Sequence, residues 1–209
     1  MNQFKHAWNF AFNNWQYFLI LAAPVMAVEI ATASLIAPVQ NVTQPEDLMT
    51  FIEDNSMVIG TIGLLGMVLS ISFIGGLFVA YNAKEEGIDI EPLSALFSGL
   101  KKFFPILGAY LLASIAVFFS AFLLILPAFY IAGRLSLFAP FIMFENKSIT
   151  ESLQLSWEKT DEHGGILFGL TLLFFLITML VASIVQSLLV PGIAQYILLG
   201  LVEYIIVIP

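Results

Sequence analysis

Three ionisable residues interrupt stretches of this sequence that are otherwise apolar: Glu29, Arg134 and Glu203. An unpaired charge inside a bilayer costs roughly 2.5 to 3.5 kcal/mol on insertion scales, so such a residue usually faces a partner or a water-filled cavity. Counting the helix rise from the outer ends of the spans puts Glu29 and Arg134 at similar depth, which predicts an ion pair between them. Glu203 lies deeper and has no evident partner, so it best supports the alternative of a proton or substrate path.

No enzymatic signature accompanies these charges, because HExxH, GxSxG, a P-loop and a GxGxxG motif in its proper context are all missing. Asp161, Glu162 and His163 are adjacent in a polar connector, where such clustering usually reflects solvation. With no cysteine, and with His6 and His163 far apart, we expect no metal site and no cofactor. The sequence therefore predicts a protein that is not an enzyme; an intramembrane enzyme would need a nucleophile and a base that it does not display.

The amino-acid composition indicates that these charged residues lie in a membrane protein. Hydrophobic residues make up 60% of the 209 positions and charged residues 11%, whereas a soluble domain carries roughly 25% charged residues. The mean hydropathy is +0.97. We expect a single all-α transmembrane domain over residues 1–209, covered largely by membrane lipid. A net charge of −8 argues against a nucleic-acid partner, whereas a protein partner or a second copy of the chain stays open.

Six stretches are long enough to cross the hydrocarbon core, which takes about 20 apolar residues. They run from Gln16 to Ala37, Met57 to Tyr81, Phe104 to Ile125, Leu126 to Phe144, Gly165 to Leu189 and Pro191 to Pro209. The third and fourth are divided at Leu126 and Pro127, because together they greatly exceed one bilayer thickness. A re-entrant loop in place of the fourth span is the main alternative. Cleavage of the first stretch as a signal peptide, after Ala33, is a second one.

The lysines predict the orientation. With the N-terminus in the cytoplasm, all of them fall in cytoplasmic segments, and no outer loop contains Lys or Arg. They are Lys5, Lys84, Lys101, Lys102, Lys147 and Lys159. The longest outer loop, Pro38 to Ser56, carries four acidic residues and no basic one. We therefore expect a multi-pass protein of the plasma membrane with a cytoplasmic N-terminus.

An amphipathic segment precedes the first, third and fifth spans, with apolar residues at three- and four-residue spacing and polar residues on the other face. In the third of them, Ser148 and Glu151 form a capping-box pattern. Trp8, Phe97 and Trp157 align as interfacial anchors, because Tyr17, Ile106 and Ile166, each nine positions later, all lie near the start of a span. The chain is thus interpreted as three units, each an interfacial helix followed by a transmembrane hairpin. Ordinary amphipathic connectors are the alternative.

Small residues in the second and fifth spans predict where helices approach closely. These are Gly60, Gly63, Gly66, Gly75, Gly76, Ala80, Gly165 and Gly169. Packing within the bundle explains them more simply than an oligomer interface does.

The runs FSGLKKFFPILGAYLL, LILPAFYIAGRLSLFAPFIMFENKSI and ITESLQLSWEKT resemble the YciC-type bacterial inner-membrane proteins. The resemblance covers roughly Phe97 to Leu180. It implies a six-span protein of the bacterial inner membrane and brings no catalytic residue with it. We expect a non-enzymatic component of the membrane or envelope. The alternative function is a small transporter or channel that uses the three intramembrane charges.

Overall fold

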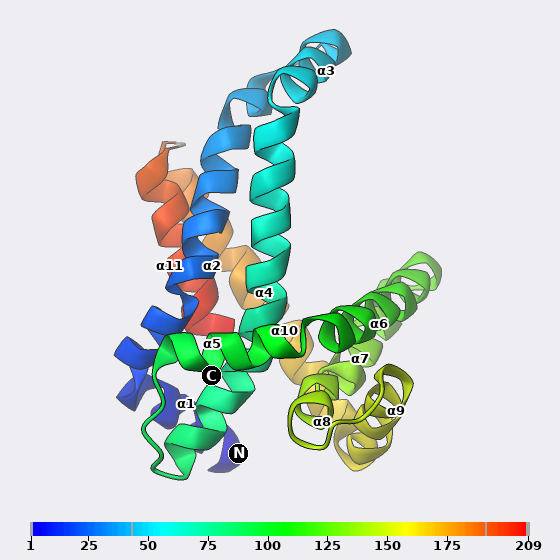
Figure 1. Ribbon diagram of the computed structural model, residues 1–209. Helices are drawn as coiled ribbons and strands as arrows, with labels where there is room; N and C mark the ends of the chain where they lie inside the picture. The colour runs from blue at the N-terminus through cyan, green and yellow to red at the C-terminus, as the bar shows by residue number, and fades with distance from the viewer. Residues whose placement is uncertain (1, 43, 191, 208–209) are drawn as a thin grey trace. The chain divides into compact units, whose positions relative to one another are not determined.

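The computed structural model describes residues 2–42, 44–190 and 192–207, and every regular element in those ranges is a helix (Figure 1). In chain order they are α1 (Asn2–Asn13), α2 (Trp15–Ile36), the 3-10 helix η1 (Ala37–Asn41), α3 (Pro45–Asp54), α4 (Ser56–Glu85), α5 (Pro92–Lys101), α6 (Phe103–Leu123), α7 (Ile125–Leu135), α8 (Phe138–Phe144), α9 (Ile149–Lys159), the 3-10 helix η2 (Asp161–His163), α10 (Gly164–Leu188) and α11 (Ile193–Val207).

Five segments in the described part of the chain are long and apolar enough to cross a membrane. They are Trp15–Val39, Ser56–Glu85, Phe103–Leu123, Ile125–Phe144 and Asp161–Leu188. These coincide with the first five predicted spans. The predicted sixth span, Pro191 to Pro209, contains α11 (Ile193–Val207). Pro191, Ile208 and Pro209 lie outside the described residues, so the count of six stays a prediction.

The break between the third and fourth predicted spans is a single residue, Leu124. Its φ of −157° and ψ of 135° are extended, and its N–H donates to the carbonyl of Ser120 at 2.9 Å. The predicted division at Leu126 and Pro127 is therefore slightly too late. Pro127 lies inside the first turn of α7, where a proline is tolerated because the early N–H groups of a helix have no partner within it.

Residue contacts divide the chain into two compact units, Met1–Ser70 with Thr178–Pro209, and Ile71–Ile177. In the first unit α2 packs along α11, and Figure 1 shows the two helices side by side. One face of α2 is buried through five residues: Phe18, Leu21, Ala22, Val25 and Met26. Tyr196 and Tyr204 of α11 are buried as well. Burial of this apolar stripe holds the unit together.

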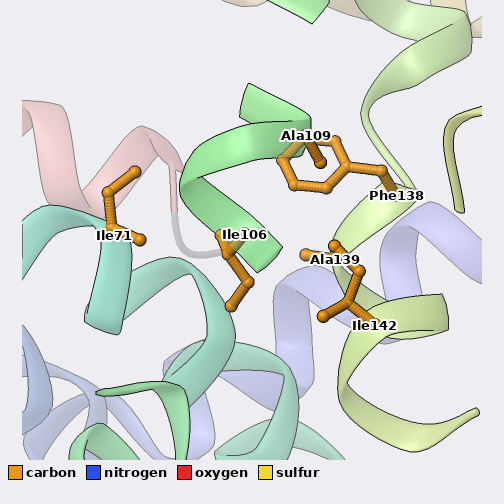
Figure 2. Close-up of a cluster of buried hydrophobic side chains, with 6 residues drawn as sticks. All are labelled: Ile71, Ile106, Ala109, Phe138, Ala139 and Ile142. Atoms are coloured by element: carbon orange, nitrogen blue, oxygen red, sulfur yellow. The ribbon is translucent and has the colours of Figure 1, made fainter. Parts of the chain in front are cut away.

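The second unit is built on a cluster of buried apolar side chains from α4, α6 and α8, which are drawn in Figure 2. The cluster consists of Ile71, Ile106, Ala109, Phe138, Ala139 and Ile142. Ile149 and Leu153 on the apolar face of α9 pack against it. The connector from α8 to α9 turns at Asn146, whose φ of 54° is a conformation that asparagine tolerates, and Lys102 donates to its side-chain oxygen.

Helices α4 and α5 meet at backbone-to-backbone distance. A Cβ added at Gly99 would lie 1.9 Å from the carbonyl oxygen of Ser72, and one at Gly76 would lie 2.9 Å from that of Ala95. The predicted close approach is thus confirmed at Gly75 and Gly76. It is wrong for four other glycines, Gly60, Gly63, Gly165 and Gly169, where no described atom lies within 4 Å of an added Cβ.

The three predicted amphipathic segments are separate short helices, α1, α5 and α9, each ending shortly before a long apolar helix. The residues at which they end have similar backbone dihedrals: φ −111° and ψ 20° at Asn14, −107° and 18° at Lys102, −94° and 3° at Thr160. Only Thr160 is followed by a 3-10 turn before the long helix. The interpretation as three equivalent units stays a prediction.

Candidate functional site

Arg134 is the most deeply buried charged residue described, with 1% of its surface exposed. It occupies the last turn of α7, where a positive charge is favoured by the helix dipole. The adjoining Gly133 packs against α10, since an added Cβ there would lie 3.1 Å from the carbonyl oxygen of Leu167. The absence of a side chain at this position therefore lets α10 come close to the arginine.

The guanidinium group is enclosed by acceptors and aromatic rings from three elements. Nε donates to the Thr160 hydroxyl at 2.9 Å, Nη1 to the Tyr130 hydroxyl at 2.7 Å, and Nη2 to both the Trp157 carbonyl and a carboxylate oxygen of Asp161, the latter at 2.9 Å. Its central carbon lies 4.3 Å from the centre of the Trp157 ring. We call these five residues the Arg134 cluster; it binds α7, α9 and η2 together through one planar cation.

Helix α9 also forms hydrogen bonds with the backbone at and just after Arg134. The Ser156 hydroxyl donates to the Arg134 carbonyl at 2.8 Å and accepts from the N–H of Leu137 at 3.1 Å. These bonds satisfy groups that are left free where α7 ends and α8 begins. Ser156 and Thr160 are both almost fully buried and lie one helical turn apart on α9. A hydroxyl-bearing edge of α9 therefore fixes the break between α7 and α8.

The capping box predicted for α9 is confirmed. The Ser148 hydroxyl and N–H both donate to the Glu151 carboxylate, at 2.7 and 3.0 Å, and the Glu151 N–H donates to the Ser148 hydroxyl. These bonds to Ser148, with a smaller contribution from Lys147, hold the pKa of Glu151 below its usual 4.5.

Because the folded-state pKa of Glu151 is lowered, the cap stabilises α9 at pH values above the pKa of the unfolded carboxyl and loses that effect as pH falls through the folded value. We expect Glu151 to titrate below 4.5 in a carboxyl-resolved NMR titration, and Ser148→Ala to return its pKa toward 4.5. Gln154→Ala, on the exposed face of the same helix, is the control and should leave that titration unchanged. A Ser148→Ala variant with the same Glu151 titration as the unchanged protein would contradict the capping role.

The predicted ion pair between Glu29 and Arg134 is wrong, since the carboxylate that pairs with Arg134 is that of Asp161. Glu29 belongs to the other unit, and there its carboxylate accepts a hydrogen bond from the Tyr204 hydroxyl at 3.1 Å. The side chain of Glu203 lies outside the described residues, so its role stays a prediction. The short connectors around α9 bring Asp161 directly to Arg134.

Of the three predicted interfacial anchors, Trp157 belongs to the Arg134 cluster. Its carbonyl and its ring both contact Arg134, and the ring also meets Tyr130 edge-on at 6.1 Å between centres. Phe97 on α5 is 60% exposed, as a lipid-facing anchor would be, and Trp8 on α1 contacts the Phe12 ring. Asp161, interpreted from sequence as simply solvated, is a member of the Arg134 cluster.

A groove of about 500 Å³ runs between α6 and the α7–α8 segment, beside this cluster. Its lining is apolar apart from Tyr110, Ser114 and Ser136, and it holds neither an acid–base pair nor a candidate nucleophile with a base. Among the described residues no group of three or more His, Cys, Asp or Glu side chains could hold a metal ion. The arrangement is suited to packing and to apolar chains rather than to proton transfer.

These helices and their apolar faces define the chain as a multi-pass, helical integral membrane protein. A family model described as the membrane domain of glycerophosphoryl diester phosphodiesterase matches residues 102–207, about half of the chain and all of the Arg134 cluster. The chain belongs to this family. No curated protein and no solved structure matches the chain significantly.

Proposed function

We propose that this chain is a non-enzymatic membrane module that holds a partner at the cytoplasmic face of the membrane. The observation that carries the proposal is the enclosure of Arg134, whose donors are taken up by Tyr130, Trp157, Thr160 and Asp161. A charge that is bonded in this way fixes the position of a helix rather than lining a path for ions. The transporter alternative has no comparable support from the structure.

The proposal also includes the orientation of the chain and the membrane in which it lies. The N-terminus is cytoplasmic, so α5, α9 and the lysine-bearing connectors are cytoplasmic too. The likeness of the segment from Phe97 to Leu180 to YciC-type proteins is the basis for placing the chain in a bacterial inner membrane.

The partner that the family description favours is a phosphodiesterase acting on glycerophosphodiesters. The module supplies the membrane attachment and the catalytic residues belong to the partner. The exposed polar face of α9, with Glu151, Gln154 and Glu158, is the surface we assign to this contact.

Two assays on the protein in proteoliposomes test the proposal that the chain is neither an enzyme nor a transporter. We expect no release of glycerol 3-phosphate from glycerophosphocholine and no dissipation of an imposed ion gradient. Turnover would make the chain an enzyme, and dissipation of the gradient would make it a transporter; either result overturns the proposal.

A fractionation assay tests the partner. In cells that express the chain, the share of glycerophosphodiester phosphodiesterase activity that sediments with membranes should rise, and Glu158→Lys on α9 should reduce that rise. Glu53→Lys on α3, in the acidic connector, is the matched charge-reversal control and should leave it unchanged. An unchanged membrane-bound share on expression of the chain argues against the proposed partner.

A further inference from the structure

The groove between α6 and the α7–α8 segment is lined by small side chains with larger ones beside them. The small residues are Ala113, Ser114, Ala132 and Ser136, and the larger ones are Tyr110, Val117, Phe118, Leu135 and Phe138. All of them belong to the unit Ile71–Ile177, in which α6 and α7 lie side by side (Figure 1). The volume of about 500 Å³ is that of a ligand site, for which roughly 300 to 1,000 Å³ is usual.

Both walls of the groove belong to segments that are long and apolar enough to cross a membrane, Phe103–Leu123 and Ile125–Phe144. Tyr110 and Phe118 on its border are exposed, so the groove is open to its surroundings. In a bilayer the surroundings of such a segment are lipid acyl chains and not water. The molecule that reaches the groove is therefore a lipid.

One end of the groove carries hydroxyl groups. Tyr110 and Ser114 lie one helical turn apart on α6. Phe138 belongs with Ala109 to the buried cluster drawn in Figure 2, so Ser136 on the facing segment lies at the same end. The Ser136 hydroxyl already donates to the Gly133 carbonyl at 2.8 Å. The Tyr110 and Ser114 hydroxyls have no hydrogen-bond partner within the described ranges.

Hydroxyls elsewhere in the apolar helices are bonded to their own backbone. Thr61 donates to the Met57 carbonyl, Ser183 to that of Met179 and Ser187 to that of Ile184, each at 2.8 Å. A hydroxyl placed in hydrocarbon without a hydrogen bond costs free energy. The two hydroxyls of the groove are therefore donors for which its occupant has to supply an acceptor.

The hydroxyl end of the groove lies close to the membrane surface. Gly108, two residues before Tyr110, contacts the start of α9, since an added Cβ there would lie 2.5 Å from Cδ1 of Ile149. Helix α9 bears exposed charged residues such as Glu151, and exposed charges do not enter the hydrocarbon. From Tyr110 to Phe118, α6 advances about 12 Å at 1.5 Å per residue. The groove thus runs from the level of the lipid ester groups into the acyl chains.

We propose that this groove binds one acyl chain of a glycerolipid, and that the Tyr110 and Ser114 hydroxyls donate hydrogen bonds to the ester oxygens of that lipid. Ester carbonyls are the acceptors that a bilayer offers at the boundary between headgroups and acyl chains. The contacts involve the glycerol esters and one chain, so they select a class of lipid and not a headgroup. The proposal is independent of the phosphodiesterase partner.

Photo-crosslinking in nanodiscs of dioleoyl phosphatidylcholine tests the proposal. A trace of the same lipid, with a diazirine in the middle of one acyl chain, is activated by light, and the cross-linked residues are located by mass spectrometry. We expect cross-links to concentrate on Ala113 and Ala132 in the groove. Leu112 and Ile115 are exposed residues of α6 outside the groove and should be labelled less. Even labelling of all four would mean that lipid only surrounds the helices, and overturns the proposal.

A diether analogue of the photoactive lipid tests the role of the hydroxyls, because it lacks the ester carbonyls. It should label the groove roughly 2- to 10-fold less than the ester lipid, the effect of one lost hydrogen bond. Tyr110→Phe combined with Ser114→Ala should lower labelling by the ester lipid to the level of the diether and leave the diether unchanged. Equal labelling of the unchanged protein by the two lipids overturns the assigned hydrogen bonds.

Filling the groove is the third measurement. Ala113→Leu should reduce labelling of the groove, because the larger side chain takes the space of the acyl chain. Ala121→Leu makes the same change at an exposed position of α6 outside the groove and should have no effect. Unchanged labelling in a folded Ala113→Leu variant contradicts the proposal. If that variant does not fold, the comparison of ester and diether lipids on the unchanged protein decides.

Discussion

Replacing Arg134 with alanine is expected to lower the free energy of unfolding by about 2 to 4 kcal/mol. The reason is the number of groups that lose their partner at once: the Tyr130 and Thr160 hydroxyls, the Trp157 carbonyl and the Asp161 carboxylate. Arg134→Lys should recover little of this, because an ammonium group is a point donor and cannot reproduce the planar fork. The measurement is helix content against increasing SDS in mixed micelles.

Asp161→Asn is the matched control for Arg134→Ala. It removes the ion pair but leaves three other acceptors in place, and the carboxylate it replaces is 76% exposed. Solvent screens a carboxylate that is this exposed, so the expected loss is below about 1 kcal/mol. If Asp161→Asn lowered the free energy of unfolding as much as Arg134→Ala, the stabilisation would come from the ion pair and not from the neutral acceptors.

The second large effect is expected at Gly99, where α5 crosses α4. A methyl group there would lie 1.9 Å from the Ser72 carbonyl oxygen and 2.7 Å from the Gly76 nitrogen, so the two backbones would have to separate. Overpacking typically costs 1 to 3 kcal/mol and occasionally more; for Gly99→Ala we expect a loss of about 3 kcal/mol, because the contacts are with rigid backbone. The same SDS titration measures it.

Gly63→Ala on α4 is the control for Gly99→Ala. No described atom lies within 4 Å of an added Cβ at Gly63, and alanine is favoured over glycine in a helix by roughly 1 kcal/mol. We expect this variant to be as stable as the unchanged protein or more so. Equal behaviour of the two variants would show that α4 and α5 are not in the close contact described.

The apolar helices were predictable from sequence because membrane insertion depends on hydropathy and length, both of which are local properties. The break near Pro127 was found for the same reason but placed late, since a proline marks the neighbourhood of a helix start and not its first residue. The Ser148 and Glu151 cap was predicted correctly because its partners are three residues apart.

The partner of Arg134 was not predictable in this way. Depth in the membrane was the only coordinate that the sequence supplied, and it favoured Glu29. The observed partners, Thr160 and Asp161, lie at the end of an amphipathic helix, and their polar side chains looked like ordinary solvent-facing residues. A useful signal was present in hindsight: hydroxyl residues Ser152, Ser156 and Thr160 recur every four positions along α9, and all three are buried.

The Arg134 cluster also affects how the chain is made. Arg134 leaves the ribosome before Trp157, Thr160 and Asp161, and the last of them follows it by 27 residues. At about 5 to 20 residues per second, synthesis leaves the arginine without these partners for roughly 1 to 5 seconds. The α6–α7 hairpin therefore cannot reach its final position until α9 and η2 have emerged, and its assembly during translation is completed from the C-terminal side.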